Sequence, residues 1–293
     1  MQPAPATLMA IKDLSLFAKM VIYGFMTGIN KSAGKGVGLE FSQYRSYQPG
    51  DDLRWLDWKM YGRSDRYYIR ESEVETGISV RFIVDASHSM AHNDSGYTKM
   101  EYARRLCAAL GYLAHKQGDA IGLYGLTEQG VHVLAARRDP QHLQRFYYQL
   151  ENLQPGGQFT GPGHYKNIFA AATRKELVVI VTDFYEREGE IGQLLKALSA
   201  YRHEIILFHV MGRNELELDY GPYSSLQDLE TGETVNIHAG QLREQYQERL
   251  KARLEAIRHQ MLERGIYYRL LRMDTPLEQA LRDFLNQRQK MSI

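Results

Sequence analysis

The sequence predicts an α/β fold, a doubly wound and mostly parallel sheet with helices on both faces. Residues 78–90 (ISVRFIVDASHSM) have the pattern of a buried strand that ends at Asp85 in a polar turn. Residues 176–183 (ELVVIVTD) repeat this pattern and again end in aspartate. Helical and strand patterns alternate along most of the remaining chain, which is typical of a sheet covered on both faces.

The other elements follow in order. Helices are predicted at 97–117, 141–150, 165–173, 189–201, 241–264 and 276–288. Strands are predicted at 119–126, 131–135, 204–210 and 266–271. The strand at 131–135 should pair antiparallel with its predecessor, because only a short turn at 128–130 separates them. A hairpin is predicted within 226–237, around the turn at 230–233.

The start of the chain predicts an amphipathic helix. Apolar residues in 8–26 mostly recur three or four positions apart, while Lys12, Asp13 and Lys19 interrupt the run. A bilayer span needs about 20 largely apolar residues, so we expect this helix to pack on the domain. Reversible contact with a membrane surface is the alternative.

Residues 39–75 alternate aromatic side chains with Arg and Lys, a pattern also found in proteins that bind single-stranded nucleic acid. Six basic and four acidic side chains lie between positions 43 and 70, so the charges nearly balance. We therefore expect Arg–carboxylate pairs and stacked guanidinium groups to hold an irregular collar, without nucleic acid. Residues 1–75 would form the helix and collar, packed on a main domain at 76–293.

The near-zero net charge excludes recruitment of partners by the overall charge of the protein. Lys and Arg total 36 against 35 Asp and Glu, a net charge of +1, so no overall field attracts nucleic acid or an anionic membrane. The single cysteine, Cys107, cannot form an internal disulfide, which fits a reducing compartment. The opening residues lack the pattern of a secretory signal. We expect a cytoplasmic protein that recognises its partner locally.

A metal site is predicted where the first strand ends. Asp85, Ser87 and Ser89 are spaced i, i+2 and i+4, so their oxygens can converge just beyond the strand. Carboxylate and hydroxyl oxygens suit Mg²⁺, with Mn²⁺ as the alternative, whereas zinc sites favour Cys and His. Taken alone, the same residues also fit an ordinary turn with capping side chains.

Two further residues favour the metal site. Asp183 ends the second buried strand, and Thr160 lies in the Gly-rich loop 156–161 between the two strands. In doubly wound sheets ligands bind beyond the carboxyl ends of the strands, where the winding reverses. This set of Asp, two Ser, Thr and a distant Asp resembles the metal-ion-dependent adhesion site of von Willebrand factor A domains.

The segment before the first strand carries a more specific resemblance. The chain reads GLEF at 38–41, YRxYxPGDDxRxxDW at 44–58 and GR at 62–63, followed by the DxSxSM turn. This series resembles the signature of the bacterial domain-of-unknown-function family fifty-eight, over about residues 28–288. The resemblance implies a von Willebrand factor A-like, Rossmann-like fold. It also implies a protein partner, a MoxR-type AAA+ ATPase served by this chain as an adaptor or co-chaperone.

Two departures from the family pattern concern Gly62, where many relatives have alanine, and the residues around Thr160. We expect a non-enzymatic module in which Mg²⁺ accepts an acidic residue of the partner. The alternatives are a Mg²⁺-dependent phosphoester hydrolase, with Asp85 orienting water, and a structural protein with a metal-free site. The hydrolase lacks an evident base, since His88 is an isolated loop histidine. Oligomeric state stays open.

Overall fold

The structure is a computed structural model. It describes residues 11–32, 43–48, 56, 58–71, 77–94, 96–161, 163–164, 175–185, 189–201, 203–220, 223–227, 229 and 234–291. The chain forms two compact units, Met26–Thr76 and a larger one made of Met1–Phe25 with Gly77–Ile293. The helix predicted at 165–173 lies outside the described residues.

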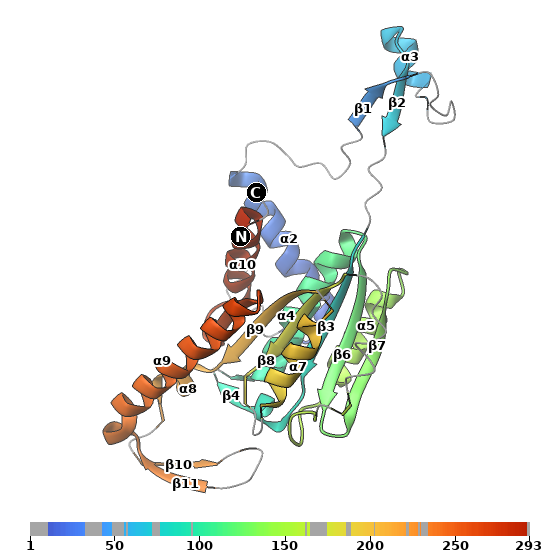
Figure 1. The fold of residues 1–293 in the computed structure, drawn as a ribbon. Helices are drawn as coiled ribbons and strands as arrows, with labels where there is room; N and C mark the ends of the chain where they lie inside the picture. The colour runs from blue at the N-terminus through green and yellow to red at the C-terminus, as the bar shows by residue number, and fades with distance from the viewer. Residues whose placement is uncertain are drawn as a thin grey trace. The chain divides into compact units, whose positions relative to one another are not determined.

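A six-stranded sheet forms the centre of the larger unit (Figure 1). Its strands are β3 (Ser79–Asp85), β6 (Ala120–Thr127), β7 (Gly130–Arg137), β8 (Leu177–Thr182), β9 (Glu204–Met211) and β12 (Tyr267–Arg272). They lie in the order β12-β9-β8-β3-β6-β7, and every pair is parallel except β6 with β7. The mostly parallel sheet and the antiparallel β6–β7 pair are confirmed.

The winding of the sheet reverses beside β3. The chain passes from β3 to β6 on one side and later returns to β8 on the other. Val84 is in register with both Gly125 of β6 and Val181 of β8. The carboxyl ends of β3 and β8 are therefore neighbours at the point where doubly wound sheets bind ligands.

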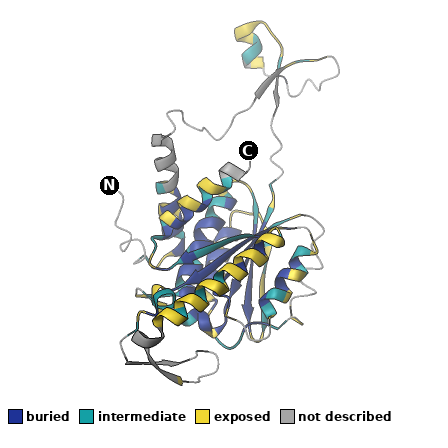
Figure 2. Ribbon diagram, turned by 60° about the vertical axis from the view of Figure 1, so that its left-hand side comes forward, coloured by how far each residue is buried: buried dark blue, intermediate teal, exposed yellow. Residues whose placement is uncertain are grey.

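Helices cover both faces of the sheet, because successive strand residues point to opposite sides. The covering helices are α4 (Lys99–Lys116), α5 (His142–Asn152), α7 (Glu190–Ser199), α9 (Ala239–Glu263) and α10 (Leu277–Met291). Ile83, Val178 and Ile180 pack in one core cluster with residues of α7 and α9. On the other face Phe82 contacts Phe146 of α5, and Phe208 contacts Phe284 of α10. The central strands β3, β6, β8 and β9 are buried on both sides, whereas the edge strands β7 and β12 are partly exposed (Figure 2).

Helix α4 begins at a capping box, which fixes where its first residue lies. The Thr98 hydroxyl accepts the Glu101 N–H at 3.1 Å, and Glu101 accepts the Thr98 N–H at 2.8 Å. The short strands β4 (Asn93–Asp94) and β5 (Tyr97–Thr98) pair just before this cap. Farther along, the helix buries Cys107, and this burial raises the pKa of its thiol.

The N-terminal helix α2 spans Leu14–Ser32, so it begins and ends later than predicted. Its buried side chains lie on one face, as the amphipathic pattern requires, and Arg105 of α4 lies 5.9 Å from the Phe17 ring centre. Within the described residues no helix is both long and apolar enough to span a bilayer. The buried side chains of α2 are Leu14, Phe17, Ala18, Val21 and Ile22.

The segment predicted to be irregular contains regular elements. In the smaller unit β1 (Gln43–Ser46) pairs antiparallel with β2 (Tyr68–Glu71), and α3 spans Trp58–Ser64. The Tyr61 and Tyr67 rings stack at 4.5 Å, so aromatic contacts accompany the paired strands. Alternating aromatic residues are also typical of a β-strand. The nearly balanced charges had instead favoured an irregular segment. Packing of this segment on the main domain stays a prediction.

A second hairpin lies in the larger unit. Strands β10 (Tyr223–Gln227) and β11 (Thr234–His238) pair antiparallel, which confirms the hairpin predicted within 226–237. The segment after β9 contains a helix that was not predicted, α8 (Arg213–Glu217). Gly212 precedes this helix, and its N–H donates to Glu215 Oε2 at 2.7 Å. That contact places Glu215 near the strand ends described next.

Candidate metal centre

The DxSxS turn folds back on itself immediately after β3. The Ser87 N–H donates to Asp85 Oδ1 at 2.9 Å, and the Ser87 and Ser89 hydroxyls lie 3.0 Å apart. Ser89 belongs to a short 3₁₀ helix, His88–Ala91. All three predicted donors are buried, so the turn gathers oxygen atoms in a site with little access to water.

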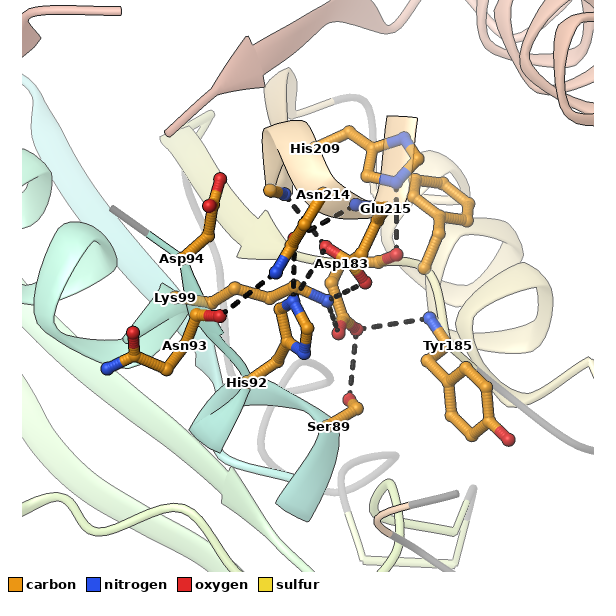
Figure 3. A network of polar contacts seen from close by, with 12 residues as sticks. Ser89, His92, Asn93, Asp94, Lys99, Asp183, Tyr185, His209, Asn214 and Glu215 are labelled. Carbon is orange, nitrogen blue, oxygen red and sulfur yellow. Dashed lines mark hydrogen bonds and ion pairs between the residues drawn. The ribbon is translucent and has the colours of Figure 1, made fainter. Parts of the chain in front are cut away.

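Asp183 joins this cluster from the neighbouring strand end. It directly follows β8, and its Oδ1 accepts the Ser89 hydroxyl at 3.1 Å (Figure 3). The same oxygen accepts the Tyr185 N–H at 3.1 Å. The structure therefore brings together Asp85, Ser87, Ser89 and Asp183 in one hydrogen-bonded group.

The loop at 156–161 lies against the same turn. The Gly156 N–H donates to the Ala86 carbonyl at 2.9 Å, and the His88 N–H donates to the Gly157 carbonyl at 2.8 Å. Gly157 has φ +67°, a left-handed conformation that favours glycine. Thr160 is buried, and its hydroxyl donates to the Thr127 carbonyl. Its hydroxyl is thus not bonded to the other four residues, and its role as a ligand stays a prediction.

A buried lysine occupies one side of the cluster. The Lys99 ammonium contacts both Asp183 and Glu215 (Figure 3). Its nitrogen lies 2.8 Å from Asp183 Oδ2 and 2.7 Å from Glu215 Oε1. Burial by itself would lower the pKa of Lys99, but the two carboxylates raise it. Burial likewise favours the protonated form of Asp183, but the ammonium group holds the pKa of Asp183 below its usual value. Both groups are therefore charged at neutral pH.

Helix α8 carries Glu215 into contact with Lys99 and is itself tied to the turn. The His92 ring nitrogen Nε2 lies 2.9 Å from Asn214 Oδ1. The Arg213 N–H donates to the Asp94 carboxylate. His92 and Asp94 thus hold α8 in place.

Asp85 differs from Asp183 because it has no cationic partner. Its Oδ2 accepts the Thr182 hydroxyl at 2.7 Å, and it forms no ion pair with any residue in the described ranges. Burial raises the pKa of Asp85 to about 7, and the nearby charge of Asp183 adds to the rise. A cation placed beside Asp85 would relieve this unfavourable burial of charge.

His209 does not supply that cation. Its Nε2 lies 3.0 Å from the Asp183 carbonyl oxygen, and its Nδ1 lies 2.8 Å from the Tyr268 hydroxyl. Burial lowers the pKa of His209 to about 4, so the ring is neutral at pH 7. Of the three neighbouring carboxylates, Asp183 and Glu215 contact the Lys99 ammonium, whereas Asp85 contacts no cationic group among the described residues.

The donor chemistry of the cluster fits a hard divalent cation. The side chains of Asp85, Ser87, Ser89 and Asp183 offer only carboxylate and hydroxyl oxygens, the ligands that Mg²⁺ and Mn²⁺ prefer. No group of three or more His, Cys, Asp or Glu side chains suited to a metal occurs among the described residues. A metal here would therefore depend on the serine hydroxyls as well as on Asp85.

Sequence reasoning missed Lys99, Glu215 and Thr182. One signal was available for Lys99, which occupies the first turn of α4, where the helix dipole disfavours a positive charge. Such a residue needs a compensating contact, and Asp183 and Glu215 provide it. Glu215 carried no comparable signal, because its short helix was not predicted.

Comparison with known families assigns the chain. The model of the family described as "Protein of unknown function DUF58" matches residues 43–256, well over half of the sequence. The chain belongs to the DUF58 family. The resemblance found in the sequence is thereby confirmed at the level of the family.

Individual relatives of this DUF58 chain are distant. "Uncharacterized protein Rv1480" of Mycobacterium tuberculosis is 26% identical over 238 residues, covering 78% of this chain and 72% of the relative. Among solved structures, BatB from Bacteroides thetaiotaomicron is 16% identical with TM-score 0.46, covering 73% of this chain and 100% of that chain. A von Willebrand factor type A protein from Catenulispora acidiphila is 17% identical with TM-score 0.32, covering 46% and 34%.

Proposed function

We propose that this DUF58 chain is a non-enzymatic, Mg²⁺-dependent protein-binding module. The observation that supports this most directly is the buried Asp85 carboxylate, which lacks a cationic partner among the described residues. It lies beside two serine hydroxyls at the reversal of the sheet winding, where doubly wound folds bind ligands. A divalent cation would supply the positive charge that this carboxylate lacks.

The residues that would hold the cation are Asp85, Ser87, Ser89, Thr160 and Asp183. Asp183 would act mainly by accepting the Ser89 hydroxyl, since its other oxygen already contacts Lys99. Thr160 donates its proton to Thr127, which leaves the hydroxyl lone pairs available to a metal. When bound, Mg²⁺ would supply positive charge and an open coordination position, which an acidic side chain of a partner can fill. Mn²⁺ is the alternative ion.

The partner that we propose is a MoxR-type AAA+ ATPase in the cytoplasm, with this chain as adaptor or co-chaperone. The resemblance of the whole motif series to the DUF58 family supports this choice. The near-neutral net charge supports recognition through a local site rather than through a global field.

Calorimetric titration with Mg²⁺ tests the metal site. We expect saturable binding by the wild type and loss of binding in Asp85→Ala, with circular dichroism unchanged. Equal binding by the variant would refute the site. With a purified ATPase partner, excess chelator and Ser87→Ala should each weaken the complex, mainly through faster dissociation.

The alternative function, a Mg²⁺-dependent phosphoester hydrolase, needs a general base near the site. His209 is buried with both ring nitrogens in contact with oxygen atoms, and His88 is exposed. Neither arrangement favours base catalysis. A phosphatase assay with Mg²⁺, comparing the wild type with Asp85→Ala, separates the two functions, and metal-dependent turnover would support the hydrolase.

A further inference from the structure

A cavity opens directly beside the candidate metal centre. Its volume is about 410 Å³, within the usual range of ligand pockets, and it lies between the carboxyl ends of β8 and β9 and one face of α9. Phe184, Met211, Leu250 and Leu254 give it an apolar lining. Asp183 lines the cavity and also bonds Ser89 of the candidate metal centre. A partner peptide bound at the metal centre would therefore have its neighbouring residues within reach of the cavity.

The rim of this cavity has an excess of positive charge. Its acidic members, Asp183 and Glu215, are already bonded to Lys99. Arg249 and Arg253 line it from adjacent turns of α9. Arg253 donates to the Phe184 carbonyl at 3.0 Å, whereas Arg249 makes no hydrogen bond or ion pair with any residue that the structure describes. Arg249 is thus available to a negatively charged ligand.

The backbone between cluster and cavity is held in an uncommon conformation. Phe184 has φ +58°, a left-handed geometry that costs a non-glycine residue on the order of 1–3 kcal/mol. Two contacts maintain it, because Phe184 donates its N–H to the Thr182 hydroxyl at 3.1 Å and offers its carbonyl to Arg253. Thr182 also bonds Asp85, so the same side chains shape the cluster and the cavity wall. Such strain is often found where a ligand is bound.

We propose that this cavity is a recognition subsite for an acidic peptide segment of a protein partner. A large apolar side chain would fill the cavity, and an acidic side chain beside it would pair with Arg249. Charge complementarity selects this occupant, because an apolar pocket with an unpaired arginine at its rim disfavours basic sequences. This inference rests on the proposed function in one respect only, which is that a second acidic residue of the same peptide would bind the metal at the DxSxS turn.

Selection from a phage-displayed random peptide library tests this subsite on the full chain in millimolar Mg²⁺. The test variant is Arg249→Glu. Its matched control is Lys251→Glu, which makes an equal change of charge on the same helix, because Lys251 lines a different cavity. We expect wild type and control to enrich peptides with an acidic residue close to Leu, Phe or Trp. A synthetic peptide of that consensus should bind Arg249→Glu about tenfold more weakly, and Leu254→Asp should lose the apolar preference.

The outcomes separate the subsite from the metal site. Identical selected sequences and affinities for wild type and Arg249→Glu would overturn the subsite, as would selection of peptides without acidic residues. If chelator abolishes peptide binding while Arg249→Glu binds normally, the metal site stands and the subsite fails. If Arg249→Glu abolishes binding while chelator has no effect, the subsite stands and the metal proposal fails. Circular dichroism of each variant confirms that the fold is retained.

Discussion

Asp85 and Asp183 end neighbouring parallel strands, but their surroundings give them opposite properties. Both are buried and both accept a backbone N–H two residues ahead. Asp183 contacts the Lys99 ammonium, whereas the donors to Asp85 in the described part of the chain are the neutral Ser87 N–H and Thr182 hydroxyl. The pKa of Asp183 is therefore lowered and the pKa of Asp85 is raised. The sheet determines where a carboxylate lies, and side chains from distant segments determine its charge.

The largest effect on stability should come from removing the Lys99 ammonium, which pairs with Asp183. Lys99→Met leaves the buried Asp183 and the partly buried Glu215 without this counter-charge. Breaking a buried ion pair such as Lys99–Asp183 costs about 3–5 kcal/mol. Urea unfolding in chelator should show this loss, and Mg²⁺ should recover part of it by supplying positive charge nearby. Lys116→Met, at the exposed end of the same helix, serves as the control. A loss no larger than in this control would mean that Lys99 does not compensate the pair.

A smaller effect of opposite sign is expected at Asp85. The folded chain keeps a proton on Asp85 that the unfolded chain releases above its ordinary pKa of 3.8, so stability without metal should fall as pH rises from about 4 to about 7. Asp85→Asn removes this penalty and should stabilise the chain by up to roughly 4 kcal/mol at pH 8, with little effect at pH 4. Thermal unfolding across this pH range in chelator measures the difference.

Two controls accompany the Asp85 experiment. Asp183→Asn should destabilise the chain at pH 8, because it removes a charge that is bonded to Lys99. Mg²⁺ should stabilise the wild type but not Asp85→Asn. Equal shifts of the same sign in the two asparagine variants would contradict the contrast between these carboxylates.

The smallest effect concerns Thr160, which lies in the loop that contacts the DxSxS turn through Gly156 and Gly157. Thr160→Val removes the hydroxyl while keeping the shape, and we expect Mg²⁺ affinity to fall by about tenfold. Thr160→Ser keeps the hydroxyl and should bind Mg²⁺ like the wild type. Calorimetry measures both variants. Unchanged affinity in the valine variant would leave Thr160 with only its structural bond to Thr127.

Much of the fold could be predicted from periodicity. The apolar runs that end at Asp85 and Asp183 are the central strands β3 and β8, and the long helical pattern after position 241 is α9. The missed elements are short ones, such as the five-residue helix α8 and the strands β1 and β2. Elements of this length depend on contacts with distant segments, which local patterns do not contain.

The candidate site divides in the same way. Asp85, Ser87 and Ser89 could be grouped because their spacing is local, and Asp183 because parallel strand ends meet at one edge of a sheet. Lys99 could not, since it lies 84 residues from Asp183 and 116 residues from Glu215 in the sequence. A pattern of residue types does not say which distant charges become neighbours.

Cys107, the single cysteine of the chain, lies fully buried in α4, the helix whose first turn carries Lys99. Only a thiolate reacts quickly with alkylating reagents, and burial keeps this thiol protonated. Its modification therefore requires α4 to open, so the labelling rate in native buffer reports how often that opening occurs. The alkylation rate of this one cysteine therefore measures the local opening of α4. Slower labelling after Mg²⁺ addition would show how far ligand binding suppresses that opening.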